Sequence, residues 1–455
     1  MDINKEIEKI IEYQNSTLPQ SSRKTREALE EIINQVKNDY EQGNYDFKKS
    51  THLAIKQGKK VRHTRSFGIF SCEETLCIYL KRLLDRKFYV KYPNRNEYIH
   101  SLFDIVSALR NMNDYVIFKF DFTDFFNSVS SEYVYKKYIS QRSFERYQND
   151  LLALFVEQTK YAYAGLNTSN IICEIIANRF DELLSMKLQD QGLIFYRRYI
   201  DDGILIFNQR ISQDDCYKVL NEVIDSVFLD DSVCVTKRCT TQLNLTKTKY
   251  ISVFDLAANN KTDCFDFLGY EFVLTPSRDD HNNKLTTKFQ YGITQKKIDK
   301  YTKKVDDIVK EYMKHNDLEL LRHQLKAFCC RTVYQIPKYK TLVWKTKGFI
   351  ANYQELRFRL DQLTPKTKNF MKSIVFNVIK ANAVPFPYFL KTNSNESAYS
   401  LYNNMEKYRT LLFVEPIGIN KEGLKKLCKQ LGIWDCNKDY DGLVRDYLIK
   451  VGVGH

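Results

Sequence analysis

The residues that decide how this chain folds are Phe195-Tyr-Arg-Arg-Tyr-Ile-Asp-Asp-Gly-Ile-Leu-Ile-Phe207. Two apolar runs rich in β-favouring residues flank the adjacent carboxylates Asp201 and Asp202, and this pattern predicts a β-hairpin with an acidic tip. Adjacent carboxylates repel each other unless a cation lies close, and Mg²⁺ prefers hard oxygen ligands. The hairpin therefore predicts one half of a magnesium site.

A second stretch, Val116-Ile-Phe-Lys-Phe-Asp-Phe-Thr-Asp-Phe-Phe126, predicts the other half. An apolar strand runs straight into Asp121, which precedes Asp201 by 80 residues. An aspartate at a strand end, followed later by an Asp-Asp hairpin, is typical of palm-type polymerases. In these enzymes two Mg²⁺ ions activate a 3′-hydroxyl and stabilise the leaving pyrophosphate. The alternative, solvated aspartates in two unrelated turns, leaves the apolar flanks unexplained.

The chain resembles the reverse transcriptases at these residues. Tyr199 to Asp202 matches the family's Tyr-x-Asp-Asp box, and Asp121 to Phe126 matches its first catalytic motif. Further blocks follow in the family's order, over roughly residues 50 to 350. They resemble the motif beneath the templating base, the motif whose lysine approaches the triphosphate, and the primer grip: Gly165 to Ser169 with Ile171 to Asp181, Asn244 to Thr248, and Phe267 to Tyr270.

The second block departs from the common pattern. Most reverse transcriptases have Pro-Gln-Gly where this chain has Tyr163-Ala164-Gly165. The departure resembles the bacterial abortive-infection and "unknown group" reverse transcriptases that defend against phage, and the class 3 two-polymerase defence systems are one group to which the chain could belong. Members of these groups can make DNA without a conventional template, or primed by the protein itself.

This resemblance implies an α+β right-hand polymerase, with fingers and palm made of an antiparallel sheet plus helices and with an α-helical thumb and C-terminal region. We expect four segments along the chain. They are an N-terminal helical extension, the fingers and palm, a basic helical thumb and an accessory helical region: residues 1–50, 51–290, 291–360 and 361–455.

The resemblance also implies the catalytic roles of Asp121, Asp201, Asp202 and Lys247. Asp121 and Asp201 would ligate both Mg²⁺ ions, Asp202 would be a weaker ligand, and the Phe122 backbone would contact a metal or the triphosphate. Lys247 would donate a proton to the departing pyrophosphate. The Phe126 ring, five residues after Asp121, would clash with a 2′-hydroxyl and so select deoxyribonucleotides.

Other residues would hold nucleotide, template and primer. Gly165 and Ser169 would shape the floor beneath the nascent pair. Lys56 and Arg62 lie in a basic stretch where cations would meet triphosphate and template, although a solvated basic loop is the alternative. Arg198 would position the hairpin or the primer, with a structural salt bridge as an equal alternative. The remaining primer and template contacts would be Tyr199, Gly269, Tyr270, Lys296, Lys300 and Lys304.

Charge supports a nucleic-acid partner. The 455 residues carry a net charge of +14, which favours a polyanion, although a generally lysine-rich proteome would give the same surplus. From Thr294 to Phe349, 14 basic residues stand against 6 acidic ones. The apolar spacing of Ile298, Val305 and Ile308 predicts a helix there, with lysines on its other face. We expect this helix to grip a phosphate backbone.

Composition indicates the cellular compartment that we expect for this chain. The 11 cysteines have no zinc-binding spacing, which favours a reduced, cytoplasmic protein. The start is polar and no apolar run approaches ~20 residues, so we expect neither signal peptide nor membrane span.

We therefore expect an RNA-directed, non-templated or self-primed DNA polymerase acting in antiphage defence with Mg²⁺ as cofactor. Its partners would be dNTPs, a template or non-coding RNA, the DNA product, and a second copy or a second reverse transcriptase. Two alternatives stay open. A palm polymerase using ribonucleotides is disfavoured by Phe126. A catalytically silent RNA-binding palm is disfavoured by the intact aspartate set, because clustered carboxylates cost stability without a metal.

Overall fold

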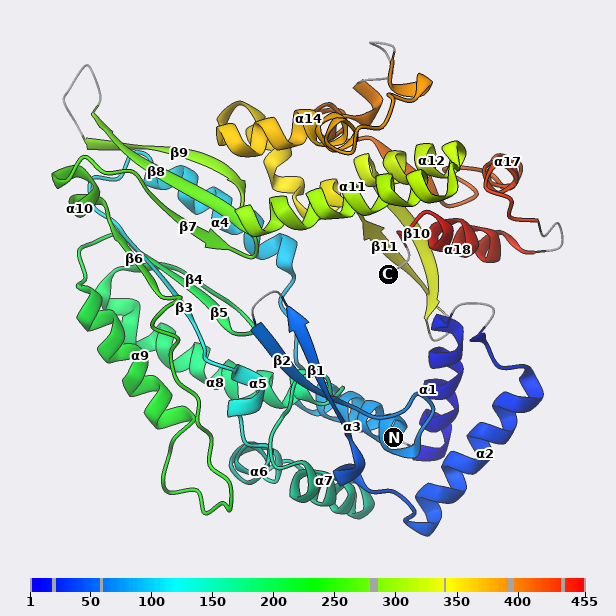
Figure 1. The fold of residues 1–455 in the computed structure, drawn as a ribbon. Coiled ribbons are helices and arrows are strands. Elements are labelled where there is room, and N and C mark those ends of the chain that lie inside the picture. The colour runs from blue at the N-terminus through cyan, green and yellow to red at the C-terminus, as the bar shows by residue number, and fades with distance from the viewer. Residues whose placement is uncertain are drawn as a thin grey trace. The chain divides into compact units, whose positions relative to one another are not determined.

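The computed structural model describes residues 2–18, 22–57, 60–278, 285–338, 341–391, 397–434 and 438–453 (Figure 1). The chain divides into two compact units, which are treated separately below. The first comprises Met1–Ser101, Asn111–Lys261 and Arg278–Thr286. The second comprises Leu102–Arg110, Thr262–Ser277 and Thr287–His455. Both combine helices with antiparallel strand pairs, so the predicted α+β class is confirmed. The four predicted segment boundaries stay predictions.

A four-stranded sheet forms the centre of the first unit. Its order is β4-β5-β3-β6, with antiparallel neighbours throughout. The strands are those that the apolar runs predict, together with one further strand: β3 (Val116–Asp121), β4 (Leu193–Tyr199), β5 (Asp202–Phe207) and β6 (Lys249–Ser252). Every residue of β3 is buried, which explains its nearly continuous apolar sequence.

Two helices cover one face of this sheet, α8 (Ser169–Leu188) and α9 (Gln213–Val227) (Figure 1). Phe120 of β3 shares one buried cluster with Phe180 of α8 and Val223 of α9. Gly203 of β5 lies opposite Phe120, and a methyl group there would overlap the Phe120 ring. Glycine at this position therefore lets the aromatic ring cross the sheet.

Further helices complete the first unit, and one of them, α4, continues into the second unit. These helices are α1 (Ile3–Thr17), α2 (Arg26–Gln42), α3 (Cys72–Phe88), α4 (Arg95–Leu109), α5 (Phe125–Ser128), α6 (Ser131–Val134), α7 (Arg146–Thr159) and α10 (Val253–Ala258). Thr25 caps α2, because its hydroxyl accepts from the Ala28 amide.

The basic stretch before α3 is a hairpin of β1 (Thr51–Gln57) and β2 (Lys60–Ser66). It pairs Lys56 with Val61, and the Lys56 side chain is exposed. The stretch is thus a hairpin and not a loop, and contact of its cations with triphosphate or template stays a prediction.

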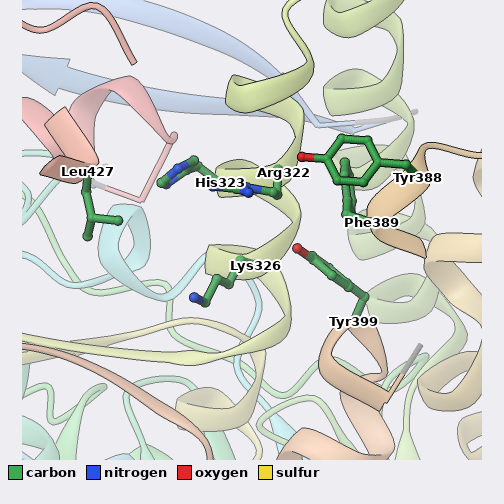
Figure 2. Close-up of a pocket in the computed structure, with 7 residues that line it drawn as sticks. All are labelled: Arg322, His323, Lys326, Tyr388, Phe389, Tyr399 and Leu427. Atoms are coloured by element: carbon green, nitrogen blue, oxygen red, sulfur yellow. The ribbon is translucent and has the colours of Figure 1, made fainter. Parts of the chain in front are cut away.

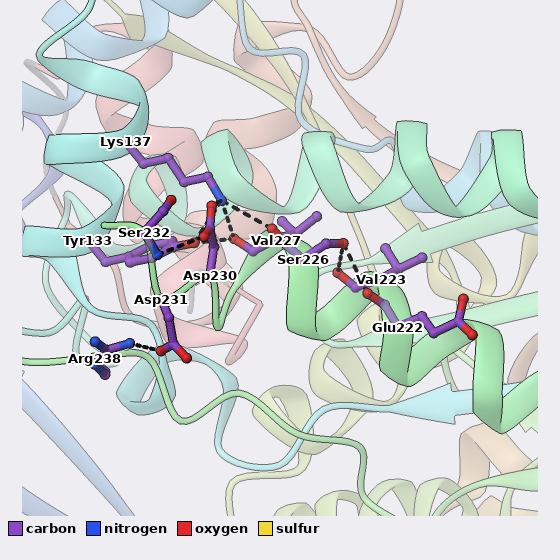
Figure 3. A network of polar contacts seen from close by, with 10 residues as sticks. All are labelled: Tyr133, Lys137, Glu222, Val223, Ser226, Val227, Asp230, Asp231, Ser232 and Arg238. Atoms are coloured by element: carbon purple, nitrogen blue, oxygen red, sulfur yellow. Dashed lines mark hydrogen bonds and ion pairs between the residues drawn. The ribbon is translucent and has the colours of Figure 1, made fainter. Parts of the chain in front are cut away.

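A lysine ties the C-terminal end of α9 to the segment after α6 (Figure 3). The Lys137 ammonium donates to the Ser226 carbonyl at 3.1 Å, the Tyr133 hydroxyl at 2.8 Å and the Asp230 carboxylate at 3.0 Å. Carbonyls at a helix end lack partners within the helix, and a cation there satisfies them while balancing the helix dipole.

The second unit begins with a sheet of order β7-β8-β9, followed by two helices: β7 (Asp263–Phe267), β8 (Tyr270–Arg278), β9 (Leu285–Ile293), α11 (Gln295–His315) and α12 (Leu318–Cys329). Helix α11 confirms the predicted amphipathic pattern. Val305, Ile308 and Val309 are buried, whereas Lys296 and Lys300 are exposed.

After α12 the structure differs from the predicted helical thumb. Two strands, β10 (Arg331–Lys338) and β11 (Thr341–Lys347), form an antiparallel hairpin, and β12 (Thr410–Phe413) pairs in parallel with β10. The reason lies in the composition, since Thr332-Val-Tyr-Gln-Ile336 and Thr341-Leu-Val-Trp344 are rich in β-branched and aromatic residues.

The rest of the second unit is mainly helical: α13 (Phe349–Asn352), α14 (Pro365–Ala381), α16 (Leu401–Glu406), α17 (Lys421–Gln430) and α18 (Tyr440–Lys450), with short 3-10 helices at Gln354–Gln362, Tyr388–Leu390 and Ser397–Tyr399. Asn420 caps α17, its side chain accepting from the Gly423 amide at 2.8 Å. Among the described residues, no helix is long and apolar enough to cross a membrane.

Candidate active site

Strand register brings two of the predicted aspartates together. Asp121 ends β3 and lies directly opposite Asp202, which begins β5. Asp201 lies in the turn after Tyr199, and its carbonyl accepts from the Phe122 amide at 3.1 Å. Residues opposite each other in an antiparallel pair have Cβ atoms ~5 Å apart. The hairpin and the first motif therefore meet at one end of the sheet, as the sequence predicted.

A lysine lies over this carboxylate pair. The Lys247 Nζ donates to Asp121 Oδ1 at 2.6 Å and to Oδ2 at 2.7 Å. Burial alone would lower the pKa of Lys247, but the hydrogen bonds and charge of Asp121, with the charges of Asp201 and Asp202, raise it. Lys247 is therefore a firmly charged ammonium group at the strand ends.

Backbone hydrogen bonds hold the loop that carries Lys247 against the end of β3. The Thr123 amide donates to the Gln242 carbonyl at 2.9 Å, and the Asn244 amide donates to the Asp121 carbonyl at 2.7 Å. The Lys247 amide then donates to the Asn244 carbonyl at 3.0 Å, and this hydrogen bond closes a turn. Two backbone bonds and one turn thus place the side chain against Asp121.

A second lysine, Lys119, lies beneath the pair. Its side chain is 9% exposed, and its Nζ lies 3.9 Å from Asp202 Oδ1. Our sequence reasoning missed this residue, although a lysine inside the apolar strand Val116–Asp121 was a visible signal. A buried cation in a strand needs a polar partner nearby, and the half-buried Asp202 carboxyl lies within reach.

Asp202 is the most perturbed carboxyl of the site. Burial and the neighbouring charges of Asp201 and Asp121 raise its pKa to about 7, against the opposing effect of Lys119. The fold therefore disfavours the ionised form of Asp202 unless more positive charge arrives.

Among the described residues, no set of three or more His, Cys, Asp or Glu side chains is arranged to hold a metal ion. The pair Asp121 and Asp202 nonetheless has the hard oxygen donors that suit Mg²⁺. The Lys247 ammonium on both Asp121 oxygens is a stand-in cation, so this position already binds positive charge. Asp121 and Asp202 are placed to hold a metal, and the ligand roles of all three aspartates and of the Phe122 backbone stay predictions.

Removing the Asp202 charge should change how stability depends on pH. In EDTA, wild-type Asp202 binds a proton in the native state up to about pH 7 but loses it near pH 4 when unfolded. Wild-type stability therefore falls as pH rises through this window. Relative to wild type, Asp202→Asn should gain about 2 kcal/mol in unfolding free energy between pH 5 and pH 8. Urea titrations of both proteins measure the difference, and a difference that is constant with pH would show that Asp202 is already ionised at pH 5.

Arg198 proves to be a structural residue. Its side chain is 2% exposed, with Nη2 2.8 Å from Glu174 Oε2 and Nε 2.8 Å from Asp181 Oδ1, both on α8. Its Nη1 also donates to the Ile200 carbonyl at 2.8 Å. Ile200 has a φ of 60°, an unfavourable value for a β-branched residue. Arg198 therefore fixes the strained turn before Asp201, and the prediction of a direct primer contact is wrong because the guanidinium is buried.

The second block forms a tight turn before α8. Gly165 has a φ of 103°, and a Cβ there would lie 2.5 Å from the Arg65 carbonyl oxygen. Ser169 is buried, and its hydroxyl donates to the Ala162 and Tyr163 carbonyls. Both residues therefore shape the backbone of this block, and contact with a nascent base pair stays a prediction.

Phe122 and Phe126 both belong to the first motif. Phe126 is half-buried in α5, whereas the Phe122 ring is buried and stacks on Phe125 with ring centroids 5.0 Å apart. Tyr199 is half-buried opposite Asp202. The Arg62 side chain lies outside the described residues.

The predicted primer-grip residues belong to the second unit. Leu268 and Gly269, with φ of 50° and 85°, form the two-residue turn between β7 and β8. Positive φ at both positions suits a type I′ hairpin. Tyr270 is buried, and its hydroxyl donates to the Asn352 carbonyl at 3.3 Å. Tyr270 is thus part of the core of this unit.

The predicted α11 lysines differ in their surroundings. Lys296 and Lys300 are exposed. Lys304 is exposed as well, but it donates to the Gly452 carbonyl at 3.5 Å, and desolvation lowers its pKa. Lys296 and Lys300 are therefore the better candidates for phosphate contacts.

No model of a known protein family matches this chain, and no curated protein does. Among solved structures, one similar chain is that of a telomerase from Candida albicans in complex with a TWJ fragment of telomeric RNA. The TM-score is 0.35 and the identity 13%, over 83% of this chain and 53% of the telomerase chain. This chain thus spans about half the length of that one. A likeness of this size does not assign a family.

Proposed function

We propose that this chain is a DNA polymerase of the reverse transcriptase type, with the first unit's sheet as palm, the β1–β2 hairpin as part of the fingers, and α11 and α12 as thumb. One observation carries the proposal. Asp121 and Asp202 face each other at adjacent strand ends, with a cation, the Lys247 ammonium, on the first of them. Paired carboxylates that attract positive charge are what metal-assisted phosphoryl transfer requires.

Different residues of the chain would then hold the metal, support the turn and donate a proton. Bound Mg²⁺ would activate the 3′-hydroxyl and stabilise charge on the leaving pyrophosphate. Asp121 and Asp202 hold that positive charge, and Arg198 keeps the turn before Asp201 in place. Lys247 is charged at neutral pH and has a proton to donate to the leaving pyrophosphate.

The direct test is incorporation of labelled dNTPs by purified protein with Mg²⁺, with and without added primer and template. No incorporation under any of these conditions would overturn the proposal.

The same reaction tests how synthesis is primed. We propose that a protein hydroxyl, such as that of a tyrosine, serves as the primer. Label that stays on the protein band through SDS and RNase supports self-priming, whereas label released by RNase indicates an RNA primer.

A role in antiphage defence, with a non-coding RNA or second polymerase as partner, is also part of the proposal. Phage plating efficiency with and without the intact gene tests this role.

Phe126→Ala should admit ribonucleotides. The ring lies half-buried five residues after Asp121, and its removal would leave room for a 2′-hydroxyl. We expect the preference of kcat/KM for dNTP over rNTP to fall at least about tenfold, since a steric clash of that size is worth more than ~1.4 kcal/mol. Phe125→Leu, a change in the neighbouring buried ring, is the control for general disturbance of α5. An unchanged ratio in Phe126→Ala would assign sugar selection to another residue.

Removing two exposed α11 lysines should weaken nucleic-acid binding and flatten its salt dependence. Each lost phosphate contact lowers the slope of log K against log salt by ~0.9 for a duplex. We therefore compare Lys296→Gln/Lys300→Gln with Lys303→Gln/Lys310→Gln, whose lysines already pair with Asp307 and Asp306 at 2.8 and 2.7 Å. Filter binding at several salt concentrations measures both slopes. Equal slopes in the two variants would assign these charges to solubility.

A further inference from the structure

A pocket of about 320 Å³ lies wholly within the second unit (Figure 2). Helix α12 lines it with Arg322, His323 and Lys326. The two 3-10 helices at Tyr388–Leu390 and Ser397–Tyr399 line it with Tyr388, Phe389 and Tyr399. Leu427 of α17 also lines it, and none of the lining residues that the structure describes is acidic. The polymerase proposal makes no use of this pocket.

One polar group of the pocket is a hydrogen-bond donor that no described residue accepts from. Tyr399 is 7% exposed, and its hydroxyl makes no hydrogen bond to any residue that the structure describes. Burial raises the pKa of Tyr399 to about 12, so the phenol keeps its proton. Figure 2 shows the Tyr388 and Tyr399 hydroxyls directed toward α12. The Tyr399 O–H can therefore donate to a ligand in the pocket.

Two cations accompany these phenols. Lys326 is exposed and has no ion pair or hydrogen bond within the described part of the chain. Arg322 pairs with Glu319 at 2.9 Å, but a guanidinium has five donors and keeps others for a ligand. Arginine, lysine and phenol donors line the same pocket, and these are the groups that bind a phosphate well.

The walls of the pocket are aromatic and rigid. The Phe389 and Tyr399 rings lie 5.2 Å apart, and the Tyr388 ring is 58% exposed. His323 is buried and held in place by the Tyr447 hydroxyl at 2.9 Å and Gln430 Oε1 at 3.1 Å. Burial lowers the pKa of His323, so its imidazole is neutral and lines the pocket without adding charge. An exposed aromatic ring beside a phosphate site suits a base, which stacks on it.

We propose that this pocket binds a nucleoside 5′-phosphate, with the phosphate on Arg322, Lys326 and the Tyr399 hydroxyl and the base against Tyr388. The volume lies in the range of small-molecule sites. The ligand chemistry has two sources, a free mononucleotide and the 5′-phosphorylated end of a strand. The proposal does not rest on polymerase activity, since the whole site lies in the second unit.

The test is calorimetric titration of the full chain in EDTA, which removes metal-dependent binding at the catalytic carboxylates. The probes are AMP, inorganic phosphate, and one hexanucleotide with either a 5′-phosphate or a 5′-hydroxyl. We expect wild type to bind AMP or the 5′-phosphorylated strand more tightly than the 5′-hydroxyl strand and inorganic phosphate. Tighter binding of AMP than of the phosphorylated strand assigns a free nucleotide, and the reverse order assigns a strand end.

Three variants locate the binding. Tyr399→Phe removes one unpartnered hydroxyl, and Lys326→Glu reverses one exposed charge. Each should weaken binding about tenfold, as expected for a hydrogen bond to a charged group. Lys380→Glu, an exposed lysine on α14, is the matched control and should bind as wild type does. Asp121→Asn should also bind normally. The proposal is overturned if no phosphate probe binds, or if Tyr399→Phe and Lys326→Glu bind as tightly as wild type.

Discussion

Asp121→Asn is expected to lower dNTP incorporation at least about a hundredfold while the protein stays folded. Asn keeps the size of the side chain but removes the charge that holds Lys247 and that would hold Mg²⁺. Removing one group that stabilises charge in a transition state typically costs a hundredfold to a thousandfold in rate. Lys247 is 45% exposed and can return to water, so the unfolding free energy should change little. Asp201→Asn should have an equally large effect on rate.

The matched control is Asp124→Asn. Asp124 is exposed in the same motif, three residues after Asp121, and its φ of 44° is a value that Asn also tolerates. Initial rates with labelled dNTPs and Mg²⁺, beside melting curves of all variants, give the comparison. Wild-type activity in folded Asp121→Asn would refute the polymerase proposal. A similar loss in Asp124→Asn would mean that general disturbance of the loop caused the effect.

Arg198→Met is expected to destabilise the protein by roughly 3–5 kcal/mol, because it leaves buried carboxylates without their cation. Glu174 is 7% exposed, and burial raises the pKa of Asp181 even with Arg198 present. Loss of the bond to the Ile200 carbonyl should also free the turn before Asp201, so that activity falls. Urea unfolding measures the first effect and dNTP incorporation the second.

Two further variants separate charge burial from loss of packing. Arg197→Met changes the exposed neighbour on the same strand and should cost less than ~1 kcal/mol. Arg198→Met/Glu174→Gln/Asp181→Asn removes all three charges and should recover part of the lost stability, since a neutral cluster avoids the cost of unpaired buried charge. If Arg198→Met does not fold at all, recovery of folding in the triple variant still tests this account. No recovery would show that packing of the arginine stem is what matters.

The sequence alone predicted the local elements that carry strong patterns. The apolar runs before Asp121 and around Asp201 and Asp202 predicted β3, β4 and β5, and the spacing of Val305 and Ile308 predicted α11. It also predicted the end of the sheet as the candidate site, because Asp121 and the Asp-Asp hairpin lie at strand ends. Such patterns can be read locally, since strands repeat every two residues and helices every 3.6.

Only the tertiary structure decided which groups meet. The register of β3 on β5 made Asp202 the direct neighbour of Asp121, and backbone bonds of the loop brought Lys247, 126 residues away, onto the same carboxylate. Burial of Arg198 against Glu174 turned a candidate primer contact into a support for the turn. The hairpin after α12 became part of a three-stranded sheet because β12, which is distant in the chain, pairs in parallel with β10. These outcomes depend on contacts between residues far apart in the chain, and no periodicity within one segment encodes them.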